Sequence, residues 1–472
     1  MHSPSSTSLS LSTSTVSAEI NLSYVWMIAF VAALGGLLFG YDWVVIGGAK
    51  PFYEPYFHLT TETQVAWANS CALIGCFLGS FAGGRASDYL GRKRVLLVSA
   101  FIFAVSSVLT GWAFHLSSFI AWRIMGGIAI GLASNVSPTY IAEISPAQWR
   151  GRLVSLNQLA LVIGILAAQI VNWLIARPVP DGLSQPAAFA SWNVQYGWRW
   201  MFTAVAVPAL IFLVTVPLIP ESPRWLVARR QNAKAGQILA KIGGERYGWL
   251  ELEGIQRSLA GSVKEVKWSA MLHGRIFTLL LIGIGLVVLQ QGSGINVFFN
   301  YAEEVYRGAG YGTNQILFNI VITGTINLLF TVLAMTLVDR FGRRRLMIFG
   351  SLGIGFCHVV ASAAYRLHLH GIWILVLTLA AIAFYAMTLA PLTWVLITEI
   401  FPNRYRGTAV SITVAVLWIA SFVLTYTFPI LNRSVGSAGA FLFYGAICFA
   451  GAAFVFATVP ETSGKPLEAM DA

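Results

Sequence analysis

The sequence is short of charged residues and of cysteine. Charged residues make up 10% of the 472 positions, whereas an ordinary soluble protein has roughly a quarter. Four cysteines occur, all inside hydrophobic stretches and without the spacing of a disulfide framework or a metal site: Cys71, Cys76, Cys357 and Cys448. The composition excludes an ordinary soluble domain and indicates a protein of the lipid bilayer. We expect the cysteines to be packing residues.

Other signals are missing as well. The first 20 residues contain no Lys or Arg and lack an apolar core followed by a cleavage site, so no cleaved signal is expected. Nothing resembles a phosphate-binding nucleotide loop, and no cofactor, metal or covalent chemistry is predicted. Of the seven histidines only His358 lies deep in an apolar stretch, where a packed core residue is the usual explanation.

The sequence contains a long-range repeat. The segment Asp88 to Arg94 returns as Asp339 to Arg345, 251 residues later. A second motif recurs at a constant offset of 256, with Glu143, Pro146, Arg150 and Gly151 matched by Glu399, Pro402, Arg406 and Gly407. Two motifs in register predict a duplicated membrane protein, and parallel repeats of this size fit a transporter whose substrate lies between two rocking halves.

Hydropathy predicts an all-α membrane protein with twelve transmembrane helices in two six-helix halves. The spans fall near 24–48, 62–83, 93–113, 118–144, 152–176 and 198–218, then 276–302, 314–338, 346–365, 372–400, 407–431 and 438–458. The expected domains are a disordered N-terminal tail (1–23), the first half (24–218), a helical linker (219–275), the second half (276–458) and a C-terminal tail (459–472).

The net charge of +11 reflects the orientation of the chain in the membrane, because the basic residues cluster in short segments between apolar spans. A nucleic-acid partner is not expected. The connections after even-numbered spans carry most of the Lys and Arg, so the positive-inside rule makes them cytoplasmic, together with the linker, both tails and both termini. The linker is expected to be a solvated helical segment or a regulatory one.

Several motifs occur in the order of one known family. They are Phe39 to Asp42, Gly84 to Arg94, Pro220 to Trp225, Gln290 to Asn296 and Val459 to Thr462. The chain resembles the sugar porters of the major facilitator superfamily over nearly its whole length. The segment Ser137 to Glu143, with Asn157 and Gln158, is most similar to bacterial proton-coupled pentose and hexose symporters of the xylose type. The resemblance implies transport of a monosaccharide.

Asp42 is the first candidate for proton coupling, because a carboxylate inside an apolar span is costly and usually faces a cavity or a partner. The first helix runs outward and the fourth inward, which places Asp42 and Arg123 at matching depths, roughly 8 to 9 Å below the outer boundary at 1.5 Å rise per residue. We expect Asp42 protonation to weaken this pair and to permit the change of access. A static ion pair that only orients the helices is the alternative.

Amides and indoles near the middle of the spans are candidate sugar ligands, because sugar hydroxyls need donors and acceptors and the ring offers an apolar face. The resemblance implies that hydrogen bonds to sugar come from Gln158, Gln290, Gln291, Asn296 and Asn327, and that Trp394 and Trp418 stack on or wall the site. For a single amide, bonding between helices is the alternative. The chain departs from the xylose-type pattern at four places: Ile165 and Leu417 each stand where that pattern has a glutamine, Asn300 replaces a tyrosine, and Leu389-Ala390 replaces Trp-Gly. These differences leave the identity of the sugar open.

The repeated charged motifs predict a cytoplasmic gate network that clasps the halves when the carrier faces outward. Its members are Gly84, Asp88, Arg92, Glu143, Arg150, Glu221, Asp339, Arg343, Glu399, Arg406 and Glu461. The alternative, basic loops that only set topology, does not explain acids at fixed offsets. By contrast, Glu303 and Glu304 are expected to be solvated, with a lid role as the alternative.

The sequence thus predicts a monomeric symporter in a bacterial-type inner membrane that imports a neutral monosaccharide with protons by alternating access. A facilitator with the same sugar site and no proton coupling is the nearest alternative. A membrane sugar sensor would need an output domain, for which about a dozen residues after Pro460 leave little room. A channel fits the duplicated gate motifs poorly.

Overall fold

The computed structural model describes residues 20–179, 187, 189–260, 271, 273–369, 371–402 and 405–461, apart from the side chains of 260, 338 and 339. Within these residues all regular secondary structure is helical. Most of the two predicted tails, part of the predicted linker and the Asp339 side chain lie outside this set.

The helices of the first half begin near Leu22. They are α1 (Leu22–Tyr56), α2 (Glu62–Leu90), α3 (Arg92–Gly111), α4 (Leu116–Ile144), α5 (Arg150–Ile175), η1 (Asn193–Gly197), α7 (Trp198–Thr203), α8 (Ala206–Thr215) and η2 (Val216–Leu218). The second half contains α11 (Gly274–Gly292), α12 (Val297–Asn300), α13 (Ala302–Gly308), α14 (Thr313–Phe341), α15 (Arg343–Arg366), α16 (Ile372–Met387), α17 (Leu389–Glu399) and α18 (Arg406–Thr458).

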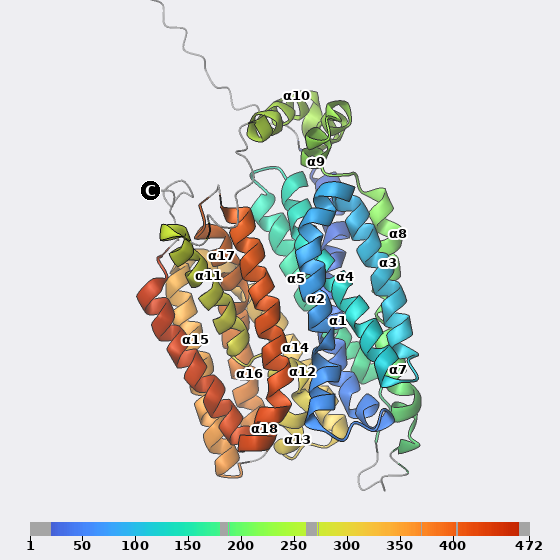
Figure 1. Cartoon of the computed structure of the whole chain (residues 1–472), viewed down its shortest axis with the longest axis vertical. Coiled ribbons are helices and arrows are strands. Elements are labelled where there is room, and N and C mark those ends of the chain that lie inside the picture. The colour runs from blue at the N-terminus through green and yellow to red at the C-terminus, as the bar shows by residue number, and fades with distance from the viewer. Residues whose placement is uncertain are drawn as a thin grey trace, which may run out of the picture. The chain divides into compact units, whose positions relative to one another are not determined.

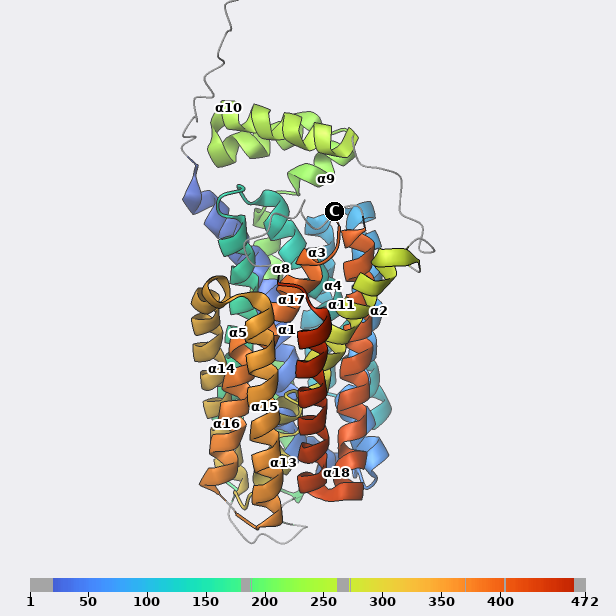
Figure 2. The ribbon, with the colours of Figure 1, turned by 90° about the vertical axis from the view of Figure 1, so that its left-hand side faces the viewer.

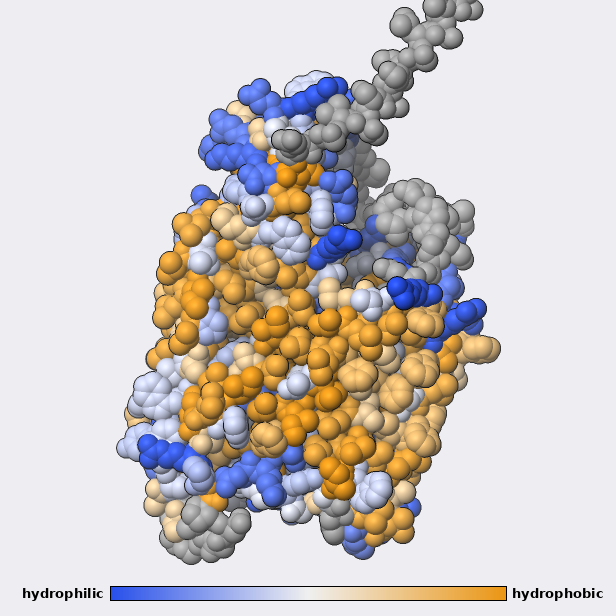
Figure 3. All heavy atoms as spheres, turned by 180° about the vertical axis from the view of Figure 1, so that it is seen from behind, coloured by the Kyte–Doolittle hydropathy of each residue, from blue (hydrophilic) through white to orange (hydrophobic). Residues whose placement is uncertain are grey.

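In the described residues, 11 helical stretches are long and apolar enough to cross a membrane. Each overlaps a span predicted from hydropathy. The last stretch, α18, has 53 residues and covers two predicted spans, 407–431 and 438–458. Its backbone leaves the helical region at Gly436, where φ is 70° and ψ is 170°. Apolar side chains cover most of the face of the molecule seen in Figure 3, as a protein surrounded by lipid requires.

The repeat found in the sequence has the same backbone geometry in both halves. Gly91 separates α2 from α3 with a φ of 99°, and Gly342 separates α14 from α15 with a φ of 84°. These positive angles strain any residue with a Cβ, which explains a glycine at both places. The end of the bundle that carries these two loops is called the basic end below.

Within the first half, α2 and α4 pack closely along small residues. A Cβ on Gly75 would lie 2.0 Å from the carbonyl oxygen of Ile124, and one on Gly127 would lie 1.9 Å from that of Ala72. Such contacts are typical of helix pairs in membranes, where close backbone packing replaces the hydrophobic effect. The two halves meet where α2 packs on α18 and α5 packs on α14 (Figures 1 and 2).

A second compact unit contains the described residues before Ile28 and residues 223–260. It contains α9 (Pro223–Ala228) and α10 (Asn232–Ala260), which is bent at Gly243 and Gly244. Its small core has Leu226, Val227 and Ala235 at the centre. The backbone N–H of Asn21 donates to the Ile242 carbonyl oxygen at 2.8 Å, which ties the start of the chain to this unit.

Candidate functional site

Asp42 on α1 and Arg123 on α4 form a buried ion pair. Nη1 of Arg123 donates to both carboxylate oxygens of Asp42, at 3.0 Å and 2.9 Å. Asp42 is 4% exposed and Arg123 is 3% exposed, so the pair is screened from water. The guanidinium also lies over the Phe202 ring at 5.3 Å. The two residues that the sequence places at one depth are therefore direct partners.

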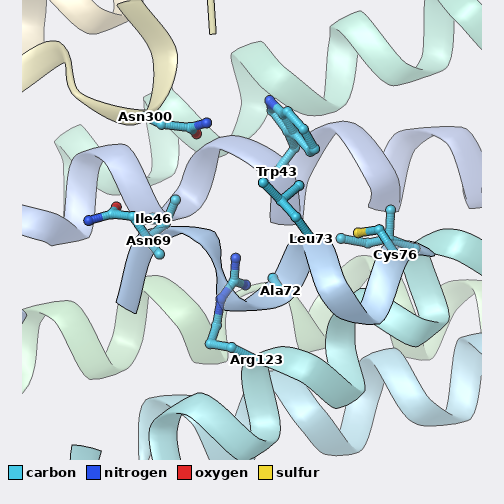
Figure 4. Close-up of a pocket in the computed structure, with 9 residues that line it drawn as sticks. Trp43, Ile46, Asn69, Ala72, Leu73, Cys76, Arg123 and Asn300 are labelled. Carbon is cyan, nitrogen blue, oxygen red and sulfur yellow. The ribbon is translucent and has the colours of Figure 1, made fainter. Parts of the chain in front are cut away.

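A small cavity opens beside this pair (Figure 4). Its volume of about 10 Å³ is close to the minimum that holds one water molecule. Three buried polar atoms at the cavity have no hydrogen-bond partner: Nε of Arg123, Oδ1 of Asn69 and Oδ1 of Asn300. Because Asn300 belongs to α12, the cavity joins the ion pair of the first half to the second half.

The predicted amide ligands of the seventh span surround a break in the helix. α11 ends at Gly292, and Gly294 follows with a φ of 77°. Nε2 of Gln290 lies 3.3 Å from the carbonyl oxygens of Leu389 and Ala390 on α17. The Gln291 Oε1 accepts from Asn296 Nδ2 at 2.5 Å, and Gln291 Nε2 lies 3.5 Å from the Gln290 Oε1. The break thus gathers three buried amides in one cluster.

His358 supports the same break from α15. Its Nε2 lies 2.8 Å from the Ser293 carbonyl oxygen, which the end of α11 frees from helical bonding. The ring also stacks near Phe298 and Phe441. This agrees with the interpretation of His358 as a packed core residue.

An aromatic group lies where the two halves meet. Trp418 of α18 is 1% exposed, and its ring centroid lies 5.7 Å from that of Phe39 and 5.9 Å from that of Trp43, both on α1. Its Nε1 is buried without a hydrogen-bond partner. The sequence suggested Trp418 but not Trp43, although a tryptophan directly after Asp42 in an apolar span was a signal that could have been followed.

The other predicted sugar ligands lie on separate helices. Gln158 on α5 and Trp394 on α17 are half-buried, and Asn327 on α14 is buried. Among the described residues, none of these three side chains makes a hydrogen bond to the amide cluster. Two residues that differ from the xylose-type pattern, Ile165 and Leu417, are buried apolar side chains.

At the basic end, charged residues of the first half bind one another. The Arg92 guanidinium contacts Asp88 at 3.0 Å and Glu143 at 3.0 Å. Oε1 of Glu221 accepts the backbone N–H of Arg92 at 3.0 Å and of Lys93 at 3.2 Å. The Arg150 Nε donates to the Ala142 carbonyl oxygen at 3.1 Å.

The second half repeats this arrangement. The Arg343 guanidinium lies 3.7 Å from Glu399, and the Glu461 carboxylate accepts the backbone N–H of Arg343 at 2.9 Å. The Arg406 guanidinium donates to the Phe401 carbonyl oxygen at 3.1 Å. A Cβ on Gly84, the remaining gate candidate, would meet nothing within 4 Å. These contacts join residues of one half to each other or to the segment that directly follows it, and the clasping role stays a prediction.

At the opposite end, the structure corrects one expectation. Glu303 and Glu304 are mostly withdrawn from solvent, with side chains 12% and 25% exposed, and the Nζ of Lys50 lies 3.6 Å from Glu303 and 2.5 Å from Glu304. Lys50 also pairs with Glu54 at 2.9 Å. Hydropathy treats each segment separately and missed this group, since its burial arises where α1 of one half meets α13 of the other.

Comparison with known proteins places this geometry in a family. The family model described as "Sugar (and other) transporter" matches residues 28–472. The chain belongs to this family of transporters. It is 37% identical to the D-xylose-proton symporter of Escherichia coli K12, over 97% of both chains. It is 39% identical to the glucose transport protein of Synechocystis, over 97% of this chain and 99% of that one.

Solved structures of the family have the same fold. The partially occluded inward-open form of the xylose transporter XylE from Escherichia coli matches with a TM-score of 0.83 and 36% identity, over 94% of this chain and 100% of that one. XylE bound to 6-bromo-6-deoxy-D-glucose matches with a TM-score of 0.79 and 37% identity, over 96% and 99%. The chain is thus a multi-pass membrane transporter of the major facilitator fold.

Proposed function

We propose that this protein imports a neutral monosaccharide together with protons by alternating access. The buried Asp42–Arg123 pair is the observation that carries the proposal, because a transporter that needs only a sugar site has no use for a titratable pair in the membrane. The cavity beside the pair reaches Asn300 of the second half, so a change at Asp42 has a direct way to affect how the halves meet.

The Arg123 guanidinium holds both carboxylate oxygens of Asp42. Taking up a proton removes the charge that binds Arg123, and the freed guanidinium then needs new partners. The orphaned Oδ1 atoms of Asn69 and Asn300 at the same cavity, with a water molecule, offer them. Protonation thereby loosens the tie between α1 and α4 and lets the loaded carrier change its access.

The sugar is proposed to bind beside the broken seventh span. Gln291 and Asn296 bond to each other here, and Gln290 bonds to the α17 backbone. A sugar with several hydroxyls replaces those bonds with its own. Gln158 and Asn327 add ligands from α5 and α14. Trp394 and the Phe39, Trp43 and Trp418 group wall the apolar face of the ring.

The proposed topology has twelve spans, with α18 counted as two spans that meet at Gly436. The basic end faces the cytoplasm of a bacterial-type inner membrane, because short loops rich in Arg are retained on that side. Both termini, the linker 219–275 and the tails 1–23 and 459–472 are then cytoplasmic. The protein is proposed to act as a monomer, and the gate candidates around Arg92 and Arg343 to clasp the halves in the outward-facing form.

The names of the relatives suggest xylose and glucose as substrates. The chain is similar to a D-xylose-proton symporter and to a glucose transport protein, at 37% and 39% identity. The apolar side chains at Ile165 and Leu417 remove two amides from the xylose-type pattern, which favours a sugar with fewer hydrogen bonds at that side of the pocket.

Uptake into proteoliposomes tests the proposal. Purified protein is supplied with xylose, glucose, galactose or arabinose, with and without an imposed inward proton gradient. We expect accumulation of one or two of these sugars above equilibrium only with the gradient. Equilibration that ignores the gradient would mean a facilitator, and the absence of any flux would contradict the transport proposal.

A further inference from the structure

Lys50 is a buried cation with three carboxylate neighbours. Its side chain is 3% exposed, and its Nζ contacts Glu54, Glu303 and Glu304 at 2.9, 3.6 and 2.5 Å. It also lies 5.8 Å from the centre of the Tyr301 ring. A lysine is almost never fully buried unless it is paired, so its position depends on these partners.

The partners of Lys50 come from both halves of the molecule. Lys50 and Glu54 belong to α1, whereas Glu303 and Glu304 belong to α13. The backbone beside them is in close contact, because a Cβ on Gly47 would lie 2.0 Å from the Phe299 carbonyl oxygen. The group therefore forms only when the ends of α1 and of the broken seventh span touch.

The charges of the group do not balance. One buried ammonium faces three carboxylates, of which Glu303 also pairs with the exposed Arg307 guanidinium at 2.7 Å. The carboxylates still outnumber the cations, and the Oε2 atom of Glu304 is buried without a hydrogen-bond partner. Removing the ammonium would leave like charges buried together, which is strongly unfavourable, whereas separating the halves would return every carboxylate to water. Lys50 is thus the residue that makes closure of this end tolerable.

We propose that Lys50 is the latch of the external end: its ammonium holds Glu303 and Glu304 while this end is closed, releases them when it opens, and so sets the balance between inward-facing and outward-facing forms. The proposal rests on the alternating access of the proposed function. Lys50, Glu54, Glu303 and Glu304 are called the external latch below. Lys50 acts on transport by positioning the two halves and touches no substrate.

The distance between the external ends tests the latch directly. Spin labels on Thr60→Cys and Leu369→Cys, both exposed positions, report on one loop of each half, and the four native cysteines are buried. Pulsed electron paramagnetic resonance measures the distance between the two labels on purified protein, without sugar and without a proton gradient. We expect one short distance in the parent protein. Lys50→Met should raise the ratio of long to short distances by about tenfold or more, and Lys50→Arg should keep the parent distribution.

A second ion pair across the halves is a matched control. Arg433 of α18 lies 3.4 Å from Glu62 of α2, with side chains 70% and 37% exposed. Because exposed pairs contribute little, Arg433→Gln should change the ratio less than about twofold. An equal shift in Arg433→Gln and Lys50→Met would overturn the special role of Lys50.

Neutralising the three acids protects the test against a misfolded variant. Glu54→Gln with Glu303→Gln and Glu304→Gln should also favour the long distance, because closure then buries Lys50 without a carboxylate. Adding Lys50→Met to these exchanges should restore the short distance, since a neutral group can be buried again. Parent-like distances in all three variants would refute the latch. Because no sugar or gradient is used, that result is distinguishable from a failure of sugar–proton transport.

Discussion

At the end opposite the basic end, Lys50 of the first half contacts Glu303 and Glu304 of the second, whereas at the basic end Arg92 contacts Asp88 and Glu143 of its own half. Two more contacts cross between the halves at the end that carries Lys50. Arg433 pairs with Glu62, and Asn314 exchanges hydrogen bonds with the backbone of Val179 at 3.1 Å and 3.2 Å.

The difference between the two ends describes one state of a rocking transporter. Charged groups that bind across the halves hold an end shut, and groups that bind within a half leave an end free to open. The comparison teaches that the two ends use different chemistry, a buried lysine at one end and repeated arginine motifs at the basic end.

The largest effect is expected from the Asp42–Arg123 ion pair, which lies between the two ends. Asp42→Asn removes the titratable group that Arg123 holds, so proton-driven accumulation of sugar should fall to the equilibrium level. Exchange of sugar across the membrane should persist, because the amide cluster is untouched. Counterflow and gradient-driven uptake in the same proteoliposomes measure the two properties. If the variant still concentrates sugar, Asp42 is not the residue that couples sugar transport to protons.

The close backbone contact at the external end predicts the next effect. Gly47→Leu places a side chain against the Phe299 carbonyl oxygen, where even a Cβ would lie at 2.0 Å, so the external end should open. The ratio of long to short label distances should rise about tenfold or more. Gly254→Leu on α10 is the control, because a Cβ there meets nothing within 4 Å. An unchanged distance in Gly47→Leu would contradict the claim that contact between the halves holds this end closed.

The external latch should respond to pH. Burial raises the pKa of Glu304 from 4.5 to about 7 in the closed form, although Lys50 opposes this shift. In the open form the carboxyl returns to water and to its ordinary pKa. The closed form is then favoured most below about 4.5 and loses this advantage as the pH rises through 7.

Label distances measured from pH 5 to 8 should therefore show a growing open population. Lys50, Tyr53 and Glu54 on α1, with Tyr301 and Glu303 beside Glu304, are the other titratable groups that face it. Glu304→Gln keeps these groups and should flatten the response. A pH dependence that survives in Glu304→Gln would assign it to another residue.

The smallest effect is expected at the sugar site. Gln290→Ala removes one side-chain amide from the cluster, which should weaken sugar binding by about 5 to 10-fold, as the loss of roughly 1 to 1.5 kcal/mol implies. Gln195→Ala is the control, because that exposed amide bonds to the Phe189 carbonyl oxygen. Binding titrations with the sugar identified by uptake measure both. Equal affinities in parent and Gln290→Ala would exclude this amide as a ligand.

Much of the architecture could be predicted because local sequence patterns determine it. Apolar runs of about 20 residues located the spans, and the offset of 251 between the two charged loops predicted two halves, whose Gly91 and Gly342 have the same backbone geometry. Matching depths in neighbouring spans were enough to suggest Arg123 as the partner of Asp42.

The rest depends on contacts between halves that no local pattern records. Lys50 lies near the end of its span, where a lysine usually reaches water, and Glu303 and Glu304 follow a span that ends beside them. Their burial appears only when α1 meets α13. In the same way, the contact of Trp43 with Trp418 joins residues that are 375 positions apart in the sequence.

Proton movement driven by sugar alone tests the central claim most directly. Proteoliposomes in weakly buffered solution, with no imposed gradient, receive the transported sugar while a pH electrode records the external medium. We predict that the medium becomes alkaline as sugar enters, and that Asp42→Asn removes this signal while sugar still equilibrates. Sugar entry in the parent protein without any pH change would contradict proton coupling and identify the protein as a facilitator.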